Sequence, residues 1–358
     1  QNNDLPAIAR SYQVLGMALH QLSQFAEALD HLQKALPLFE ELHDDKNTAT
    51  TLRSIGGTLI DLGEYADALG LLLRASEMAA RTAYAEEQIA CLMNIASLYG
   101  VENNPAQALE VYAEAEALAS QHNLPYQRGI ICRNMGVNAC RLGDNDRAIV
   151  LLRKALALQH QLKNRPLMAG CLESLGSVFV RSGQQEKALR YYTAALRIQR
   201  GSPPGLPMAV TLFNVGTLLD NAGRANEALA CTLEALHIAE TIDAKKFACD
   251  MHRRCALLYE ERDDTINACH HLKRCLELTQ ELSETEKQKA LSLYQVRFEV
   301  ERNRARQEEL QRRLREAEHT ALRAQMNPHF ISNALNAIQS FIIEGDNEEA
   351  QRYLSLFA

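Results

Sequence analysis

The sequence predicts an all-α protein: a right-handed α-solenoid of seven repeated helix pairs, then a coiled-coil helix and the first part of a helical hairpin. Three observations predict this class. The composition combines 47% hydrophobic residues with only 6% aromatic residues and no Trp, which favours helices over a β-rich core. A 40-residue pattern recurs seven times over residues 1–280. Beyond Leu293, apolar residues recur at heptad spacing, and neither Gly nor Pro interrupts them before Pro328.

Each repeat carries one hydrophobic and two small positions that return every 40 residues. The hydrophobic position holds Leu15, Ile55, Ile95, Met135, Leu175, Val215 and Cys255. The first small position holds Ala28, Ala68, Ala108, Ala148, Ala188, Ala228 and Ala268. The second holds Ala35, Ala75, Ala115, Ala155, Ala195, Ala235 and Cys275. Small residues at fixed positions let two helices cross closely, so each repeat predicts two amphipathic helices joined by a short turn.

Repeat five shows the order of these positions clearly, in the segments LGSVF and KALRYYTAAL. The order resembles that of the tetratricopeptide repeat, and it is made by Leu175, Gly176, Phe179, Ala188, Tyr192 and Ala195. The period of 40 residues is longer than the usual period of about 34, which implies longer helices and a wider concave surface. The resemblance implies that residues 1–280 form a sensor or interaction domain with a protein or peptide ligand in its groove. Residues Gly201–Pro207 keep the register, so they are predicted to be the turn between repeats five and six.

A polar column directly precedes the hydrophobic position, at Ser54, Asn94, Asn134, Ser174 and Asn214. The resemblance implies that Asn94, Asn134 and Asn214 hold the backbone of a peptide ligand. An amide suits that task because it both donates and accepts hydrogen bonds. Arg53 and Arg133 lie beside the column and are candidates for binding ligand carboxylates. Alternatively, the asparagines bond neighbouring repeats to each other, and both interpretations stay open.

Composition and charge exclude several classes of protein. The net charge of −7 argues against a broad nucleic-acid surface, so no direct nucleic-acid partner is predicted. No apolar run reaches the roughly 18 residues that span a bilayer, and no signal peptide opens the chain. We expect a cytoplasmic protein, with a membrane tether in an upstream segment left open.

Cysteine usage also indicates a reducing compartment. The nine cysteines are odd in number and scattered along predicted helices, which argues against a disulfide framework. The densest group of metal-ligand types is Cys269, His270, His271 and Cys275. Because Cys275 belongs to a column of small residues, we predict that it packs in the core and that the group holds no metal.

Residues 281–324 are predicted to form a coiled-coil signalling helix. The seam consists of Leu293, Val296, Val300, Leu310, Leu314, Ala317, Ala321 and Ala324. Asn303 and Gln307 interrupt it, and a polar seam residue often fixes register and strand number. We predict a parallel homodimer. The alternative is a single charged helix that lies on the last repeat.

The segment QMNPHFISNALNAI resembles the phosphoacceptor motif of LytS-type sensor histidine kinases, which commonly reads Q-[IM]-x-P-H-F-[LI]-[FY]-N-x-L-N. The matching residues are Gln325, Pro328, His329, Phe330, Asn333, Leu335 and Asn336. The sequence departs from the motif at Ser332, where the family usually has an aromatic residue. The resemblance implies that His329 accepts a phosphoryl group and that residues 325–358 begin the phosphoacceptor and dimerisation domain.

The chemistry of the segment agrees with that role. A neutral imidazole is a competent nucleophile near pH 7. Pro328 would leave the carbonyl of Ala324 unpaired and bend the helix, which would present His329. Asn333 is four residues on, therefore on the same face, where it could orient the imidazole or a water. An EGDN turn and a second helix over residues 348–357, capped by Asp346 or Asn347, complete a helical hairpin.

No D-x-G-x-G or Walker glycine loop occurs in the sequence. We therefore expect no cofactor in this chain, ATP and Mg²⁺ on a domain outside it, and no activity of the chain alone. By resemblance the phosphoryl group would pass to an aspartate of a response regulator, often of the LytTR type. The alternative is a non-enzymatic tetratricopeptide scaffold that oligomerises through its C-terminal helices. A gene that ends near Ala358 would favour that alternative.

Overall fold

The computed structural model describes the backbone of residues 5–325 and 328–355, and all of its regular elements there are helices. The chain divides into two compact units, residues 1–290 and residues 291–358. None of the described helices is long and apolar enough to cross a membrane. The predicted all-α class is therefore confirmed.

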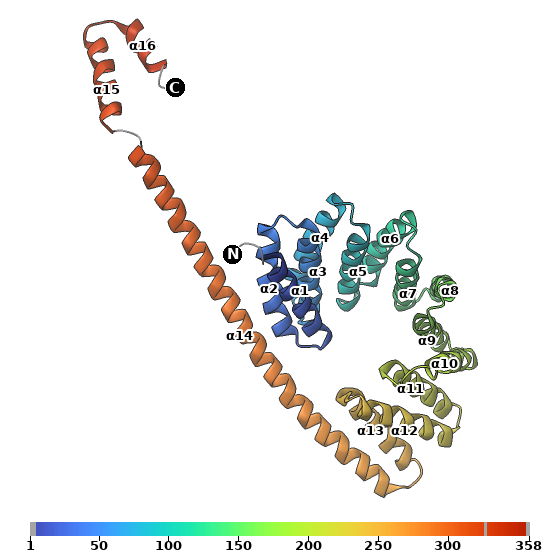
Figure 1. The fold of residues 1–358 in the computed structure, drawn as a ribbon. Coiled ribbons are helices and arrows are strands. Elements are labelled where there is room, and N and C mark those ends of the chain that lie inside the picture. Colours follow the sequence, from blue (N-terminus) through green and yellow to red (C-terminus); the bar gives the residue numbers. More distant parts are fainter. Residues whose placement is uncertain (1–4, 326–327, 356–358) are drawn as a thin grey trace. The chain divides into compact units, whose positions relative to one another are not determined.

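The first unit is a solenoid of helix pairs (Figure 1). The first helices of the pairs are α1 (Leu5–Gln21), α3 (Asp45–Asp61), α5 (Ala85–Val101), α7 (Pro125–Arg141), α9 (Arg165–Arg181), α11 (Leu206–Asn221) and α13 (Lys245–Glu260). The second helices are α2 (Phe25–Glu41), α4 (Tyr65–Arg81), α6 (Pro105–Gln121), α8 (Asn145–Gln161), α10 (Gln185–Gln199), α12 (Ala225–Thr241) and the start of α14 (Thr265–Gln325). The seven predicted helix pairs are confirmed.

Three-residue turns explain the length of the repeat. Most helices of the solenoid have 17 residues, so one helix and one turn occupy 20 residues and a pair occupies 40. In the first turn Ser23 has φ 60°, the Ser23 N–H donates to the His20 oxygen, and the Gln24 N–H donates to the Leu19 oxygen. These bonds form a Schellman motif, which satisfies carbonyls at the end of the helix. Gly201–Pro207 lies between α10 and α11 as predicted, and the register continues beyond it.

The two columns of small residues form the core, as predicted. Every alanine in them is fully buried except Ala268, which is 7% exposed, as is Cys275. The two helices of a pair also approach each other closely at a glycine of the first helix. A Cβ atom on Gly136 would lie 2.6 Å from Cγ of Leu152, so this position has no room for a side chain.

The two ends of the solenoid have exposed apolar residues. Leu15 in repeat one is 45% exposed, whereas Ile55 at the matching position of repeat two is 3% exposed. Leu272 and Leu276 in repeat seven are also exposed, while their counterparts Leu32 and Leu36 are buried or half-buried. The difference follows from stacking, because the inner repeats are covered by a neighbour on both sides.

The helix α14 continues without interruption from repeat seven to Gln325. The predicted domain boundary at residue 281 therefore falls inside a helix. Along the seam, Leu310 and Leu314 are 58% and 60% exposed. The side chains of Leu293, Val296 and Val300, and of the polar interruptions at 303 and 307, lie outside the described part of the chain.

A helical hairpin follows α14, made of α15 (Pro328–Ile343) and α16 (Asn347–Ser355). The turn uses Gly345 with φ +81°, and the Glu349 N–H donates to Oδ1 of Asp346 at 3.2 Å. Asp346 is thus the N-cap of α16, as one of the two predictions had it. The last residues of the predicted second helix, 356–358, lie outside the described residues.

Candidate functional site

The first helices of the pairs line the inner side of the solenoid, as α5, α7 and α9 show in Figure 1. A cavity of about 330 Å³ opens between α1, α3 and α5. Its lining is Met17, His20, Gln21, Arg53, Ser54, Gly57, Ile60, Asp61, Asn94 and Ser97. The cavity therefore brings together two predicted ligand-binding residues, Arg53 and Asn94, from successive repeats.

The other two asparagines of the predicted column are half-buried on the same face of α7 and α11. Asn134 Nδ2 donates to the Tyr112 hydroxyl at 3.3 Å, which joins repeat four to repeat three. This contact shows the structural role that was the alternative for the column. Asn94 lines the cavity, and Asn214 takes the matching position on α11.

The two predicted arginines lie in different electrostatic surroundings. The Nε of Arg53 donates to Oε1 of Glu87 at 2.5 Å, and the Glu87 side chain is only 6% exposed. The Nε of Arg133 is buried and has no hydrogen-bond partner, while its NH1 lies over Gly170 of α9. Arg53 is therefore engaged within the protein, and Arg133 keeps unused donor capacity.

Sequence reasoning did not select Asp61 and His20, which lie on the wall of this cavity. His20 Nε2 lies 3.6 Å from Oδ2 of Asp61, and the Thr58 hydroxyl lies 3.2 Å from His20 Nδ1. Asp61 is the last residue of α3, and the matching position in the other repeats carries exposed polar or charged residues, except in repeat three, where it is Val101. A comparison of the charges at this position of the sequence, repeat by repeat, could have identified Asp61.

His329 is the second residue of α15, and its side chain lies outside the described part of the chain. Pro328 takes the first position of the helix, where proline's missing N–H costs no helical hydrogen bond. The bend predicted there falls on Met326 and Asn327, which lie outside the described residues. Asn333 follows His329 by four residues on the same helix and is exposed.

The hairpin beneath the motif is held by a small apolar contact. Ala334, Ile338 and Ala350 are buried, and the rings of Phe341 and Tyr353 lie 5.9 Å apart between their centroids. Leu335 and Ile342 lie on another face of α15 and are exposed. The hairpin thus leaves apolar side chains uncovered.

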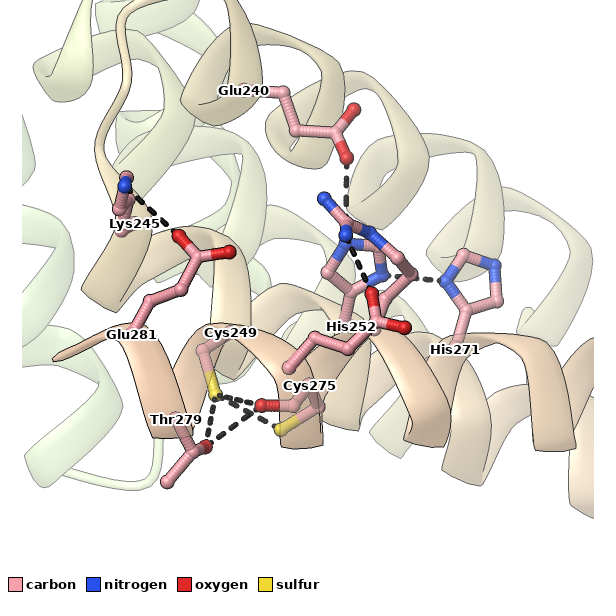
Figure 2. A network of polar contacts seen from close by, with 10 residues as sticks. Glu240, Lys245, Cys249, His252, His271, Cys275, Thr279 and Glu281 are labelled. Atoms are coloured by element: carbon pink, nitrogen blue, oxygen red, sulfur yellow. Dashed lines mark hydrogen bonds and ion pairs between the residues drawn. The ribbon is translucent and has the colours of Figure 1, made fainter. Parts of the chain in front are cut away.

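A buried polar network joins the N-terminal part of α14 to the neighbouring helices α13 and α12 (Figure 2). The Nδ1 atoms of His252 on α13 and His271 on α14 lie 2.8 Å apart. His252 Nε2 lies 3.3 Å from Oε1 of Glu240 on α12, without a well-aligned hydrogen bond. Burial lowers the pKa of both histidines.

Two cysteines lie beside this histidine pair. The Sγ atoms of Cys249 and Cys275 lie 2.9 Å apart, and both side chains are buried. Figure 2 shows the two side chains facing each other. Burial raises the pKa of Cys275, so its thiol stays protonated and unreactive. Cys275 packs in the core as predicted. Among the described residues, no group of three or more His, Cys, Asp or Glu could hold a metal ion.

Models of known families match parts of both units. Residues 8–46, 48–83 and 129–201 match models of the tetratricopeptide repeat. These matches fall in repeats one, two, four and five of the solenoid. Residues 317–358 match the histidine kinase model, which covers the end of α14 and the hairpin. No curated protein sequence matches the chain.

Solved structures share the fold of the tetratricopeptide repeats at low sequence identity. The Rap conjugation gene regulator of the plasmid pLS20 in complex with the Phr* peptide aligns with a TM-score of 0.57 at 15% identity, over 79% of this chain and 76% of its own. Aspartyl phosphate phosphatase F from Bacillus subtilis aligns with a TM-score of 0.58 at 16% identity, over 75% and 69%. A signal transduction ATPase with a tetratricopeptide repeat sensor from Pyrococcus horikoshii has a TM-score of 0.59 at 15% identity, over 79% and 44%.

Proposed function

We propose that this chain is the sensor and phosphoacceptor part of a cytoplasmic histidine kinase of the LytS type. The tetratricopeptide repeats take a protein or peptide signal, α14 transmits it, and His329 accepts the phosphoryl group. The observation that carries the proposal is the histidine kinase match over residues 317–358, which contains the motif around His329.

The transfer uses the imidazole of His329 as nucleophile. A neutral ring nitrogen attacks the γ-phosphorus of ATP, the bond from that phosphorus to the bridging oxygen breaks, and ADP leaves. ATP and Mg²⁺ are held by a catalytic domain outside this chain. Asn333, one helical turn after His329, orients the imidazole or a water. An aspartate of a response regulator, of the LytTR type, then receives the phosphoryl group.

The repeats supply the sensing part. The solved complex of the Rap conjugation gene regulator with the Phr* peptide has the same fold and supports a peptide as the class of signal. The cavity that Arg53 and Asn94 line on the inner side supports the same class, because its serines and amide can bond a peptide backbone. The continuous helix α14 supports direct mechanical coupling between repeat seven and the hairpin.

The hairpin pairs with a second copy of itself in this proposal. Leu335 and Ile342 are exposed on α15, and Leu310 and Leu314 are exposed on α14. Burying these residues against a second chain would form a coiled coil and a four-helix bundle.

The test combines this chain with a separately expressed ATP-binding domain from the same gene and γ-labelled ATP. We expect acid-labile label on the parent chain and none on a His329→Ala variant. A His319→Ala variant, which changes another histidine just before the motif, is the matched control and should label normally. If the parent stays unlabelled beside an active ATP-binding domain, the phosphoacceptor role fails and a tetratricopeptide scaffold remains.

A further inference from the structure

The last residues of the first helices form a column along the inner side of the solenoid. The column consists of Gln21, Asp61, Val101, Arg141, Arg181 and Asn221, together with Glu261 directly after α13, and all of its side chains are exposed. Gln21 and Asp61 line the inner cavity, so the column faces the groove. Its charges are segregated: a carboxylate in repeat two, two guanidinium groups in repeats four and five, and a second carboxylate, Glu261, in repeat seven.

Repeat two presents a net negative charge to the groove. The only arginine on the cavity wall, Arg53, is already neutralised by the buried Glu87. The Asp61 side chain is 47% exposed and has His20 beside it, which carries a charge only when protonated. The remaining polar lining consists of neutral serine and amide groups. A basic group therefore finds an available carboxylate here and several hydrogen-bond acceptors.

Repeats four and five present positive charge. Arg141 NH1 donates to the Gly100 oxygen at 3.0 Å, which holds the guanidinium against the C-terminal end of α5 in repeat three. Burial raises the pKa of Tyr112, and the hydrogen bond from Asn134 and the charges of Arg133 and Arg141 oppose that rise. Arg181 acts in the same way on Cys140.

In the part of the chain that the structure describes, no carboxylate pairs with this basic region. Among the described residues, none of Arg133, Arg141 and Arg181 makes an ion pair. The carboxylate of Glu173 accepts hydrogen bonds from Gln199 and Thr211, at the joint between repeats five and six. Three cations without an ion-pair partner among the described residues therefore remain in repeats four and five.

We propose that the groove selects an extended peptide with separated charges: a basic group over Asp61 in repeat two, and an acidic group over Arg133, Arg141 and Arg181 in repeats four and five. This inference rests on the proposed role of the repeats as a peptide sensor. Complementary charge at two points along a groove gives specificity and register more than affinity. Because the groups are solvent-accessible, the preference weakens as salt screens them.

The test uses two pools of fluorescent peptides of equal length and composition with the full chain. In one pool lysines and glutamates are separated to opposite ends by neutral spacers of varied length, and in the other they alternate. We expect at least tenfold tighter binding of the separated pool at low salt. A variant with Arg141→Glu and Arg181→Glu should lose that preference, and Asp61→Asn should reduce it. Arg153→Glu, on an exposed arginine of the second helix α8, is the control that should keep it.

The outcomes separate this inference from the proposed function. Equal binding of both pools overturns the charge selection and leaves the repeats as a peptide sensor. Binding of neither pool overturns the inference and also the peptide-sensing half of the proposed function, while labelling of His329 tests the other half independently. A preference that survives the arginine reversals also overturns the inference.

Discussion

Arg53 of α3 and Glu87 of α5 form an ion pair across the joint between repeats two and three, with Nε and Oε1 2.5 Å apart. The carboxylate is almost fully buried, so this arginine is its counter-charge within the protein. A position that the sequence assigns to ligand binding therefore also holds two repeats together.

Removing Arg53 should destabilise the solenoid. Arg53→Met leaves the Glu87 carboxylate buried without its partner, and we expect a loss of about 3 kcal/mol in the free energy of unfolding. Urea unfolding followed by circular dichroism measures it. Arg74→Met is the control, because its pair with Glu40 has side chains 52% and 40% exposed and should contribute no more than about 1 kcal/mol. Equal losses of unfolding free energy in the two variants would show that the burial of Glu87 does not increase the contribution of its ion pair to stability.

A methyl group at Gly136 should also destabilise the fold. The added Cβ would lie 2.6 Å from Leu152, so helices α7 and α8 must move apart, at a cost of about 1 to 3 kcal/mol. Gly70→Ala is the matched control, because an added Cβ there meets nothing within 4 Å. That variant should gain up to about 1 kcal/mol from helix propensity. A stabilised Gly136→Ala variant would mean that α7 and α8 do not pack this closely. Both values come from urea unfolding midpoints.

Acid should lower the free energy of unfolding through the histidine pair between α13 and the N-terminal part of α14. Burial lowers the pKa of His252 and His271 below 6.5, whereas Glu240 raises that of His252 in part. The unfolded chain then binds more protons than the folded chain once the pH falls to about 6.5. Stability is therefore fully present above that pH and is lost as the pH falls through the lowered values, by up to about 1.4 kcal/mol per pH unit for each histidine.

The measurement is urea unfolding between pH 8 and pH 5. His271→Phe keeps a ring to stack on Tyr259 and should flatten the pH dependence. His237→Gln, on an exposed histidine of α12, should leave the slope unchanged. A slope that persists in His271→Phe would assign the acid sensitivity to other groups.

Charges on the seam of α14 should prevent self-association. Leu310 and Leu314 are exposed in the single chain, and Leu310→Asp with Leu314→Asp would place carboxylates in the proposed coiled coil. We expect the dimer dissociation constant to rise at least tenfold in sedimentation experiments. Gln311→Asp with Arg315→Asp, on exposed positions beside the seam, should change it little. A parent chain that sediments as a monomer at all concentrations contradicts the proposed homodimer.

The repeat architecture could be predicted from the sequence because the same steric requirement occurs seven times. Ala28 and its six counterparts must be small wherever two helices cross, and a requirement repeated at a fixed interval is visible without coordinates. The cap at Asp346 was predictable for a similar reason, since a side-chain acceptor and the N–H groups it bonds lie within one turn. The motif around His329 is also local, because its residues fall within fifteen positions, 325–339.

The interpretation of the groove needed the tertiary structure. Arg53 and Arg133 have the same place in the repeat, yet one is neutralised by Glu87 and the other has a buried donor without a partner. A charge acts on a ligand only to the extent that the fold leaves it uncompensated, and the compensating residue is 34 positions away for Arg53. That the charge of Asp61 is available to a ligand could be inferred only after the pairing of Arg53 with Glu87 was known.

By itself, then, the sequence determined the α-solenoid, its period and the position of the histidine kinase motif, because these depend on local sequence pattern and on repeated small residues. The tertiary structure alone decided that the second helix of repeat seven and the predicted signalling helix are one helix, α14, and that His252 meets His271 near its N-terminal end. It also decided which charges of the groove are left uncompensated within the protein and can therefore act on a ligand. These are contacts between side chains distant in sequence, and burial and partners, not residue identity, set their energies.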